Sequence, residues 1–365
     1  MKTLDLIVFS VPCAVTKQIF RFKMASLDNS EGLFMAKYDV YGIGNALVDM
    51  EFEVTPEFLQ KMNVEKGLMT LVDENRQEEL LNNLDKLGHK RSCGGSAANT
   101  IIAVSQFGGK SFYSCKVASD ETGDFYYTDL VKEGVNTNIT DKREEGVTGK
   151  CMVFITPDAD RTMNTYLGIT ATFSKNELVY DEIEKSKYLY IEGYLVTGPN
   201  SLEAAVEAKA HAEKTGVKTA LTFSDPGIVS YFKDGFKTIL GQTGVDLLFC
   251  NESEALAFTD TKTFEEAAKE LKKVAKAFAI TLGPKGAYIF DGQNEIHIIT
   301  NKVEAIDTNG AGDLFAGSFL YAITNGHSFA SAGRLACSAA SVLVTQFGAR
   351  LDKEQAHTIK KEVLA

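Results

Sequence analysis

The sequence contains no run of eighteen apolar residues, the length that a helix needs to cross the hydrocarbon core of a membrane. It also has no excess of positive charge, because 49 Asp and Glu residues outnumber 38 Lys and Arg residues and give a formal net charge of -11 at pH 7. This balance disfavours broad electrostatic attraction to nucleic acid or to anionic lipid. We therefore expect neither a membrane nor a nucleic acid as a partner.

Patterns typical of disulfide frameworks and zinc sites are absent as well. No two cysteines form a C-x-x-C pair, and no group of His or Cys residues has the spacing of zinc ligands. Free thiols in a cytoplasmic protein explain scattered cysteines better than a disulfide framework does. The cysteines are Cys13, Cys93, Cys115, Cys151, Cys250 and Cys337.

Two common nucleotide-binding motifs are also missing. No segment matches the Walker pattern G-x-x-x-x-G-K-[ST], which excludes a P-loop enzyme. The segment Gly42-Ile43-Gly44-Asn45-Ala46-Leu47 ends without the third glycine of a dinucleotide-binding turn, which argues against a Rossmann-type dehydrogenase.

What the sequence does contain is the composition of an ordinary globular protein, with 44% hydrophobic and 24% charged residues over 365 positions. In the second half, short apolar runs alternate with helical periodicity, which is typical of a mainly parallel sheet covered by helices on both faces. We therefore predict an α/β fold with three αβα layers. The predicted strands cover 188–191, 218–223, 247–250, 277–282 and 287–290, and the predicted helices cover 202–215, 253–258, 263–274, 312–325 and 328–345.

The first half contains pieces that do not fit this layering. Residues 151–156 and 162–167 alternate in polarity on either side of a Pro-Asp-Ala-Asp turn, which predicts a β-hairpin. We expect a small β-rich lid, formed by about 50–72 and 148–170, on a domain that extends over 36–365. Further helices are predicted over 55–62, 74–87, 96–107 and 123–133, and further strands over 38–42 and 112–117.

Residues 1–35 form a separate problem. An apolar stretch over 6–15 has nearly the length of a signal peptide, but Lys2 and Asp5 give no positively charged start, and Lys17 and Arg21 follow in place of a cleavage site. We expect a disordered tail or a start-site artefact here, with a targeting segment as the alternative.

The most informative segment is Asp307-Thr308-Asn309-Gly310-Ala311-Gly312-Asp313, where we expect a strand to end, a glycine-rich turn to follow and a helix to begin. A helix N-terminus offers free N–H groups to an anion, and glycines allow close approach of the backbone. Asp313 would then stand beside an anion site and could accept a proton from an attacking hydroxyl. From the residues alone, an ordinary turn with Asp313 matched to the helix dipole explains the pattern equally well.

This segment resembles the C-terminal signature D-T-x-G-A-G-D of the ribokinase-type (PfkB) carbohydrate and nucleoside kinases. The resemblance extends over about 38–351 and implies a ribokinase-like fold, ATP as phosphoryl donor and Mg²⁺ as cofactor. It implies that Asp313 is the catalytic base and that Asp307 and Thr308 lie near the nucleotide phosphates and a monovalent-cation site, such as one for K⁺. The implied anion hole consists of Gly310, Ala311 and Gly312.

Two further segments are predicted to contact the substrate. Gly94-Gly95-Ser96 opens a helix of small residues with Asn99 one turn later, and it resembles the N-terminal signature of the family, whose residues contact substrate hydroxyls. Asn45 and Asp49 are four residues apart, and their side chains could hold a vicinal diol. The resemblance transfers diol binding to Asp49. Tight helix packing for the first segment and capping or turn roles for the second are the alternatives.

The remaining motifs concern the nucleotide. Asn251 and Glu254 resemble the N-x-x-E motif of the family, and a carboxylate there could hold Mg²⁺ through water. The alternative is a capped helix start. The turn from Thr281 through Gly283 to Gly286 resembles the ATP-binding turn of the family, and a plain Gly/Pro turn is the alternative.

Arg161 lies at the predicted hairpin tip, where an arginine could neutralise phosphate charge in the transition state. Nucleoside kinases of this family often carry an arginine at the lid. The alternative is a solvated surface arginine.

Within the family, residues 160–168, 307–310 and 346–350 resemble the adenosine kinase branch. One departure is Gly227, which stands where eukaryotic adenosine kinases carry an aromatic residue that encloses the purine; Tyr194 or Phe154 are candidates for stacking instead. The prediction is an ATP-dependent kinase for adenosine or another purine nucleoside, acting as a monomer or a homodimer. A kinase for a ribose- or fructose-like sugar and a catalytically silent nucleoside sensor are the alternatives.

Overall fold

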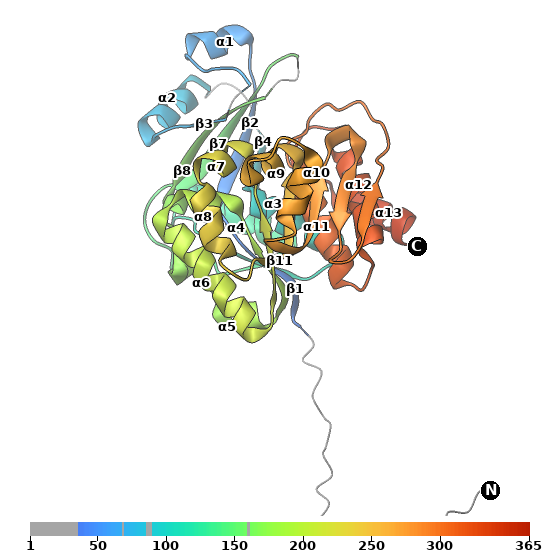
Figure 1. Ribbon diagram of the computed structural model, residues 1–365. Helices are drawn as coiled ribbons and strands as arrows, with labels where there is room; N and C mark the ends of the chain where they lie inside the picture. The colour runs from blue at the N-terminus through green and yellow to red at the C-terminus, as the bar shows by residue number, and fades with distance from the viewer. Residues whose placement is uncertain (1–35, 68, 85–89, 159–160) are drawn as a thin grey trace, which may run out of the picture. The chain divides into compact units, whose positions relative to one another are not determined.

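The computed structural model describes residues 36–67, 69–84, 90–158 and 161–365 (Figure 1). The predicted extension over 1–35 lies outside these residues, as do residues 85–87 of one predicted helix and Ala159 and Asp160 of the predicted hairpin turn. Nowhere in the described residues does a helix combine the length and the apolar character that crossing a membrane requires.

A nine-stranded sheet forms the centre of the domain over 36–365. Its pairs are parallel from β12 to β6, and only β13 and β14 at one end are antiparallel. The predicted mainly parallel sheet is therefore confirmed. In spatial order the strands are β14 (Glu295–Ile298), β13 (Ala287–Phe290), β12 (Ala275–Thr281), β11 (Val245–Asn251), β10 (Lys218–Thr222), β9 (Ser186–Ile191), β1 (Tyr38–Ile43), β5 (Ser111–Ser114) and β6 (Asn136–Thr137).

Helices cover both faces of this sheet, because the side chains of each central strand alternate between two apolar clusters. On β11, Leu247 and Phe249 belong to one cluster, and Leu248 and Cys250 belong to the other. The first cluster includes α3 (Ser96–Gln106), α4 (Glu121–Lys132), α11 (Ala311–Thr324), α12 (Phe329–Leu343) and α13 (Lys353–Leu364). The second includes α5 (Tyr180–Glu184), α6 (Pro199–Thr215), α7 (Pro226–Tyr231), α8 (Lys233–Leu240), α9 (Glu252–Thr259) and α10 (Phe264–Leu271).

A second, five-stranded sheet accompanies the large one, and Figure 1 shows α1 (Pro56–Lys61) and α2 (Glu74–Leu84) beside it. β7 and β8 pair antiparallel, which confirms the predicted hairpin. The sheet also recruits a strand just before α3 that was not predicted. The spatial order is β3 (Met69–Leu71), β8 (Arg161–Gly168), β7 (Thr148–Ile155), β2 (Leu47–Glu53) and β4 (Lys90–Gly94).

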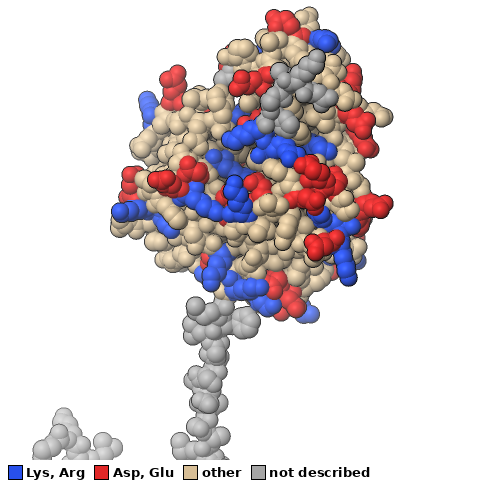
Figure 2. Space-filling view, turned by 180° about the vertical axis from the view of Figure 1, so that it is seen from behind, with Lys and Arg blue, Asp and Glu red and all other residues tan. Residues whose placement is uncertain are grey.

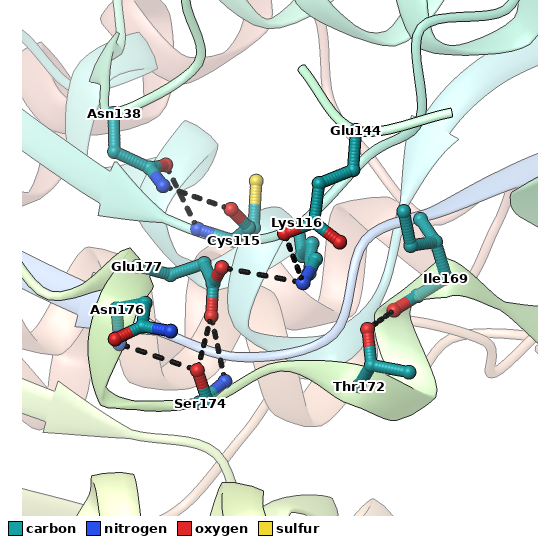
Figure 3. Close-up of polar contacts among 9 residues, drawn as sticks. All are labelled: Cys115, Lys116, Asn138, Glu144, Ile169, Thr172, Ser174, Asn176 and Glu177. Atoms are coloured by element: carbon teal, nitrogen blue, oxygen red, sulfur yellow. Dashed lines mark hydrogen bonds and ion pairs between the residues drawn. The ribbon is translucent and has the colours of Figure 1, made fainter. Parts of the chain in front are cut away.

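The chain that leaves the small sheet is tied back to the end of β5 by polar contacts (Figure 3). After β8 come the short 3-10 turns η1 (Ile169–Thr172) and η2 (Lys175–Glu177). Lys116, just beyond β5, pairs with Glu144 at 2.9 Å and with Glu177 of η2 at 3.5 Å. Asn138 hydrogen-bonds to both backbone groups of Cys115 at 3.0 Å. These contacts fix the return of the chain into the large sheet.

Lys and Arg side chains are mixed with Asp and Glu side chains over the face of the molecule in Figure 2. On this face, therefore, the basic side chains do not form one continuous surface.

One predicted element is wrong. The sequence was expected to place a strand directly before the glycine-rich turn, but residues 299–309 form neither strand nor helix. Two backbone bonds hold this segment, since the N–H groups of Ile306 and Asp307 donate to the carbonyl of Val344 at 2.7 and 3.1 Å. The segment lies beside the end of α12 and not in the sheet, and periodicity cannot distinguish such a run from a strand.

Candidate active site

The glycine-rich turn opens α11, and its two glycines serve different purposes. Gly310 is the N-cap with φ 73°, and a Cβ there would lie 2.6 Å from the carbonyl oxygen of Ala349, so both conformation and space require glycine. Gly312 is exposed, and a Cβ there would meet nothing within 4 Å. Because the first turn of a helix leaves N–H groups without intrahelical acceptors, this open backbone suits an anion.

Asp313 in the first turn of α11 is held by α3. Ser96 Oγ donates to one carboxylate oxygen at 2.7 Å, and Asn99 Nδ2 donates to the other at 3.3 Å. Burial raises the pKa of Asp313 to about 6, although these two hydrogen bonds lower it. A carboxylate with such a pKa is ionised at neutral pH and is suited to accepting a proton.

Gly94 and Gly95 join β4 to α3 and allow close packing. A Cβ at Gly94 would lie 2.4 Å from the Asp49 carboxylate, and one at Gly95, with φ 102°, would lie 2.3 Å from the carbonyl oxygen of Asn45. Asp49 on β2 is therefore close against this turn. Burial raises its pKa to about 7, while the positive charge of Arg350 lowers it.

Asn45 lies between β1 and β2 and binds Glu192, which sequence reasoning missed. The backbone N–H and the Nδ2 of Asn45 both donate to the Glu192 carboxylate at 3.1 Å, and so does the N–H of Ala97. Burial raises the pKa of Glu192 to about 8. Asn45 is thus engaged by Glu192, and diol binding by Asn45 together with Asp49 stays a prediction. Glu192 directly follows a predicted strand, and this position at the carboxyl end of a parallel strand was the available signal.

Two cavities meet beside Asp313. A larger one of about 320 Å³ has mainly apolar walls formed by α12, the loop over 300–308 and the turn between β12 and β13, and its lining includes Thr281, Gly283, Gly286, Thr308 and Ala311. A smaller one of about 70 Å³ is lined by Asn251, Glu254 and Asp313. Thr281, Gly312 and Phe315 line both. An elongated ligand in the large cavity would thus point toward the carboxylate.

Asn251 and Glu254 form a capping box at the start of α9, directly after β11. Asn251 Oδ1 accepts from the Glu254 N–H at 2.9 Å, and the Glu254 carboxylate accepts from the Asn251 N–H at 3.0 Å and from Asn251 Nδ2 at 2.7 Å. Burial raises the pKa of Glu254 to about 7. Within the described residues, no group of three or more His, Cys, Asp or Glu could hold a metal ion directly. These residues therefore fit Mg²⁺ bound through water and phosphate oxygens only.

Arg161 begins β8, and its side chain is turned toward the segment before α11 and not toward solvent. Its guanidinium pairs with Asp307 at 2.8 Å and with Glu51 at 3.7 Å, and it lies 5.7 Å from the ring centre of Phe347. Asp307 also accepts from the N–H groups of Gly348 at 2.9 Å and Asn309 at 3.0 Å. The alternative of a solvated arginine is therefore wrong, because only 10% of its side chain is exposed.

The two aromatic candidates for stacking on a base, Phe154 and Tyr194, differ in burial and in surroundings. Phe154 on β7 is fully buried and packs against Phe52 of β2 and Phe58 of α1, so its ring has no free face for a ligand. Tyr194, in the 3-10 turn η3 (Gly193–Thr197), is half-buried, and Asp225, Glu192 and Asp313 all raise the pKa of its hydroxyl after the larger effect of burial. Tyr194 therefore lies near the carboxylates of the site.

Comparison with known proteins agrees with this geometry. The PfkB family of carbohydrate kinases matches residues 72–356. Among curated relatives, an adenosine kinase from Saccharomyces cerevisiae is 30% identical over 305 residues, with 78% of this chain and 88% of that protein covered. An uncharacterized sugar kinase from Archaeoglobus fulgidus is 27% identical, with 68% and 97% covered.

Solved structures show the same likeness. The adenosine kinase from Sinorhizobium meliloti is 34% identical, with a TM-score of 0.81 and coverage of 90% of this chain and 99% of that chain. A probable sugar kinase from Rhizobium etli has the same values. The adenosine kinase from Schistosoma mansoni in complex with 2-fluoroadenosine, 21% identical with a TM-score of 0.75 and coverage of 87% and 99%, shares the fold.

Proposed function

Since the chain belongs to the PfkB family of carbohydrate kinases, we propose that it transfers the γ-phosphoryl group of ATP to a primary hydroxyl of a purine nucleoside, with adenosine as the substrate. The observation that carries this proposal is Asp313, an ionisable carboxylate held at an open helix N-terminus beside a cavity of about 320 Å³. A carboxylate there can accept the proton of a hydroxyl, and the adjacent helix amides can stabilise the charge on the phosphoryl group.

On the acceptor side, residues of β2, α3 and α11 would bind the substrate and accept its proton. Asp49 and the turn at Gly94 and Gly95 hold the ribose hydroxyls, with Ser96 and Asn99 fixing the carboxylate of Asp313 toward the attacking oxygen. The amides of Gly310, Ala311 and Gly312 receive the developing negative charge. Asn45 acts through Glu192, which holds the connection between β1 and β2 and the start of α3 together.

On the nucleotide side, the large apolar cavity would hold the adenine of ATP, with Thr281, Gly283, Gly286 and Thr308 along its wall. Mg²⁺ neutralises phosphate charge when it is bound, and Asn251 and Glu254 would hold it through water. Arg161 neutralises charge from the side of the small sheet. A K⁺ site near Asp307 belongs to the proposal as well and is tested by titrating KCl against turnover.

We place this enzyme in the cytoplasm, because the five cysteines in the described residues are free and buried. Whether it acts as a monomer or a homodimer is measured directly by light scattering on the purified chain.

The test is ATP turnover with a panel of adenosine, other nucleosides, ribose and fructose. We expect kcat/KM for adenosine to exceed that for ribose by at least about tenfold, since a site for the base adds apolar contacts that a free sugar lacks. The second candidate is a sugar kinase, favoured by Gly227 in place of an aromatic residue. A preference for ribose or fructose over adenosine would establish it. ATP consumption with any acceptor would exclude the silent sensor, against which the intact Asp313 already argues.

A further inference from the structure

Arg350 lies beyond the last strand, in a segment to which the proposed function assigns no role. Its side chain is only 14% exposed, and its three nitrogen groups reach three different elements. Nε donates to Asn99 Oδ1 on α3 at 3.1 Å, Nη1 to Asp129 Oδ2 on α4 at 3.3 Å, and Nη2 to Cys93 Sγ on β4 at 3.2 Å.

The contact with Asn99 decides how the amide of that residue is turned. A guanidinium can only donate hydrogen bonds, so the atom of Asn99 that faces Arg350 must be the carbonyl oxygen. The NH₂ group of Asn99 must then face the other way, where it donates to Asp313 Oδ2 at 3.3 Å. Without the donor at Arg350, nothing in this contact would prevent the amide from turning its oxygen toward the carboxylate, which would repel it.

The guanidinium itself has little freedom to move. Asp129 Oδ2 accepts from Arg350 and also from the Cys93 N–H at 2.9 Å. Burial raises the pKa of Asp129, but the hydrogen bonds from Cys93 and the charge of Arg350 outweigh it and leave the pKa lowered, so the pair is charged at neutral pH. A planar guanidinium that is fixed on both Nη groups presents Nε–H in one direction.

We propose that Arg350 is a positioning residue for the phosphoryl transfer, which orients the amide of Asn99 so that it donates to the catalytic carboxylate of Asp313. This inference rests on the proposed function, since it assigns Asp313 the role of base. It does not depend on whether the acceptor is a nucleoside or a sugar, because the proposed contact runs from Arg350 through the amide of Asn99 to the base.

The test is a double-mutant cycle on kcat with Arg350→Gln and Asn99→Ala, measured with the best acceptor of the wild-type enzyme. We expect Arg350→Gln to lower kcat about 30-fold or more, with KM for ATP changed by less than about threefold, because the cavity for ATP does not include Arg350. In the Asn99→Ala background the same substitution should change kcat by less than about threefold, since the amide through which it acts is gone.

Two controls separate this role from a loss of fold. Arg91→Gln removes another arginine that joins β4 to α4, through Glu121 at 2.9 and 3.0 Å, and it should leave kcat within about twofold of wild type. Arg350→Lys keeps the charge but not the planar fork, and should restore little of kcat. Should Arg350→Gln itself prove too unstable to assay, Arg350→Lys replaces it in the cycle.

The outcomes are distinct. Multiplicative effects of the two substitutions in an active enzyme would overturn the positioning role. A wild-type chain that phosphorylates no nucleoside and no sugar would instead overturn the proposed function, and the positioning role with it.

Discussion

Helices α9 and α11 begin at the same small cavity, but they treat their first turns in opposite ways. α9 is closed by the side chains of Asn251 and Glu254, which satisfy each other and the backbone. α11 begins with Gly310, which has no side-chain cap, and continues with the open Gly312. A capped helix start is stabilised internally, whereas an uncapped one keeps its N–H groups available for a ligand. The anion site is therefore expected at α11, and α9 is expected to contribute only a carboxylate.

The largest effect that would test this contrast comes from Asp313→Asn. Loss of the base at the open helix should lower kcat by at least about a thousandfold, a usual size for an essential group, with the fold intact. Turnover under saturating ATP measures it, and circular dichroism checks the fold. Asp352→Asn, at the N-cap of α13, is the matched control and should keep normal kcat. Near-normal turnover of Asp313→Asn would remove the assignment.

The two glycines of α11 should fail in different ways when each is replaced by Ala. Gly312→Ala meets open space, so its melting temperature should stay close to that of wild type, while kcat falls roughly tenfold or more because the methyl group occupies the anion site. Gly310→Ala faces a positive φ and the Ala349 carbonyl, and should lose about 1–3 kcal/mol of stability. Thermal unfolding and kcat, measured for both variants, test these two expectations. A stable, fully active Gly312→Ala variant would contradict an anion site at Gly312.

A smaller effect is expected at the capped helix. Glu254→Gln keeps a side chain that can complete a capping box, so stability should change by less than about 0.5 kcal/mol. Loss of the carboxylate should lower kcat roughly tenfold and raise the Mg²⁺ concentration needed for half-maximal rate. Glu266→Gln, at the same position of α10, is the control. An unchanged Mg²⁺ titration would leave Glu254 with a capping role only.

The smallest predicted effect is a shift on the pH axis. Asp313 must be deprotonated to act as a base, so kcat/KM should fall about tenfold per unit as pH decreases below its pKa of about 6. The neighbouring carboxyls of Asp49 and Glu254 have pKa values of about 7, so the decrease of kcat/KM on the acid side of the pH profile should begin near pH 7. Ser96→Ala removes a hydrogen bond that lowers the pKa of Asp313, so the fall of kcat/KM should begin at a higher pH than in the wild type. Ser105→Ala on the same helix should leave the pH profile of kcat/KM unchanged.

The sequence predicted the layers well because strongly periodic segments dominate the second half. The strand that ends at Asn251 and the helix that follows it were predicted from periodicity and from the capping pattern, and the structure has both. β4 was not predicted, since Lys90, Arg91 and Ser92 give it no apolar alternation, and only its pairing with β2 makes it a strand.

The candidate site shows the same division. Ser96 and Asn99 were found because they lie next to a glycine pair, and the structure brings both to Asp313. Glu192 and Arg350 were missed because their partners are far away in sequence: Arg350 lies 251 residues from Asn99, and Glu192 lies 147 from Asn45. A single sequence carries no signal for such distant pairs. The one indication it offers is that a residue such as Glu192 directly follows a predicted strand. The excluded Phe154 makes the complementary point, because alternation did not tell which face of the small sheet would be packed.

The passages of the chain from one sheet to the other have a consequence for movement. β1 continues into β2 through Gly44, Asn45 and Ala46, and β4 continues into α3 through Gly95. The chain also passes between the small sheet and the rest of the domain from β6 to β7 and from β8 to η1, so any rotation of the small sheet would bend all four connections. Glu192 joins the first two of them by binding Asn45 and Ala97. Of the residues proposed to hold the acceptor, Gly94 and Gly95 lie at one of these joined connections, and Asp49 lies against them. The turn proposed to receive the acceptor is thus tied to α3, the helix that holds Asp313 through Ser96 and Asn99, so that a movement of the small sheet would leave acceptor and base in register.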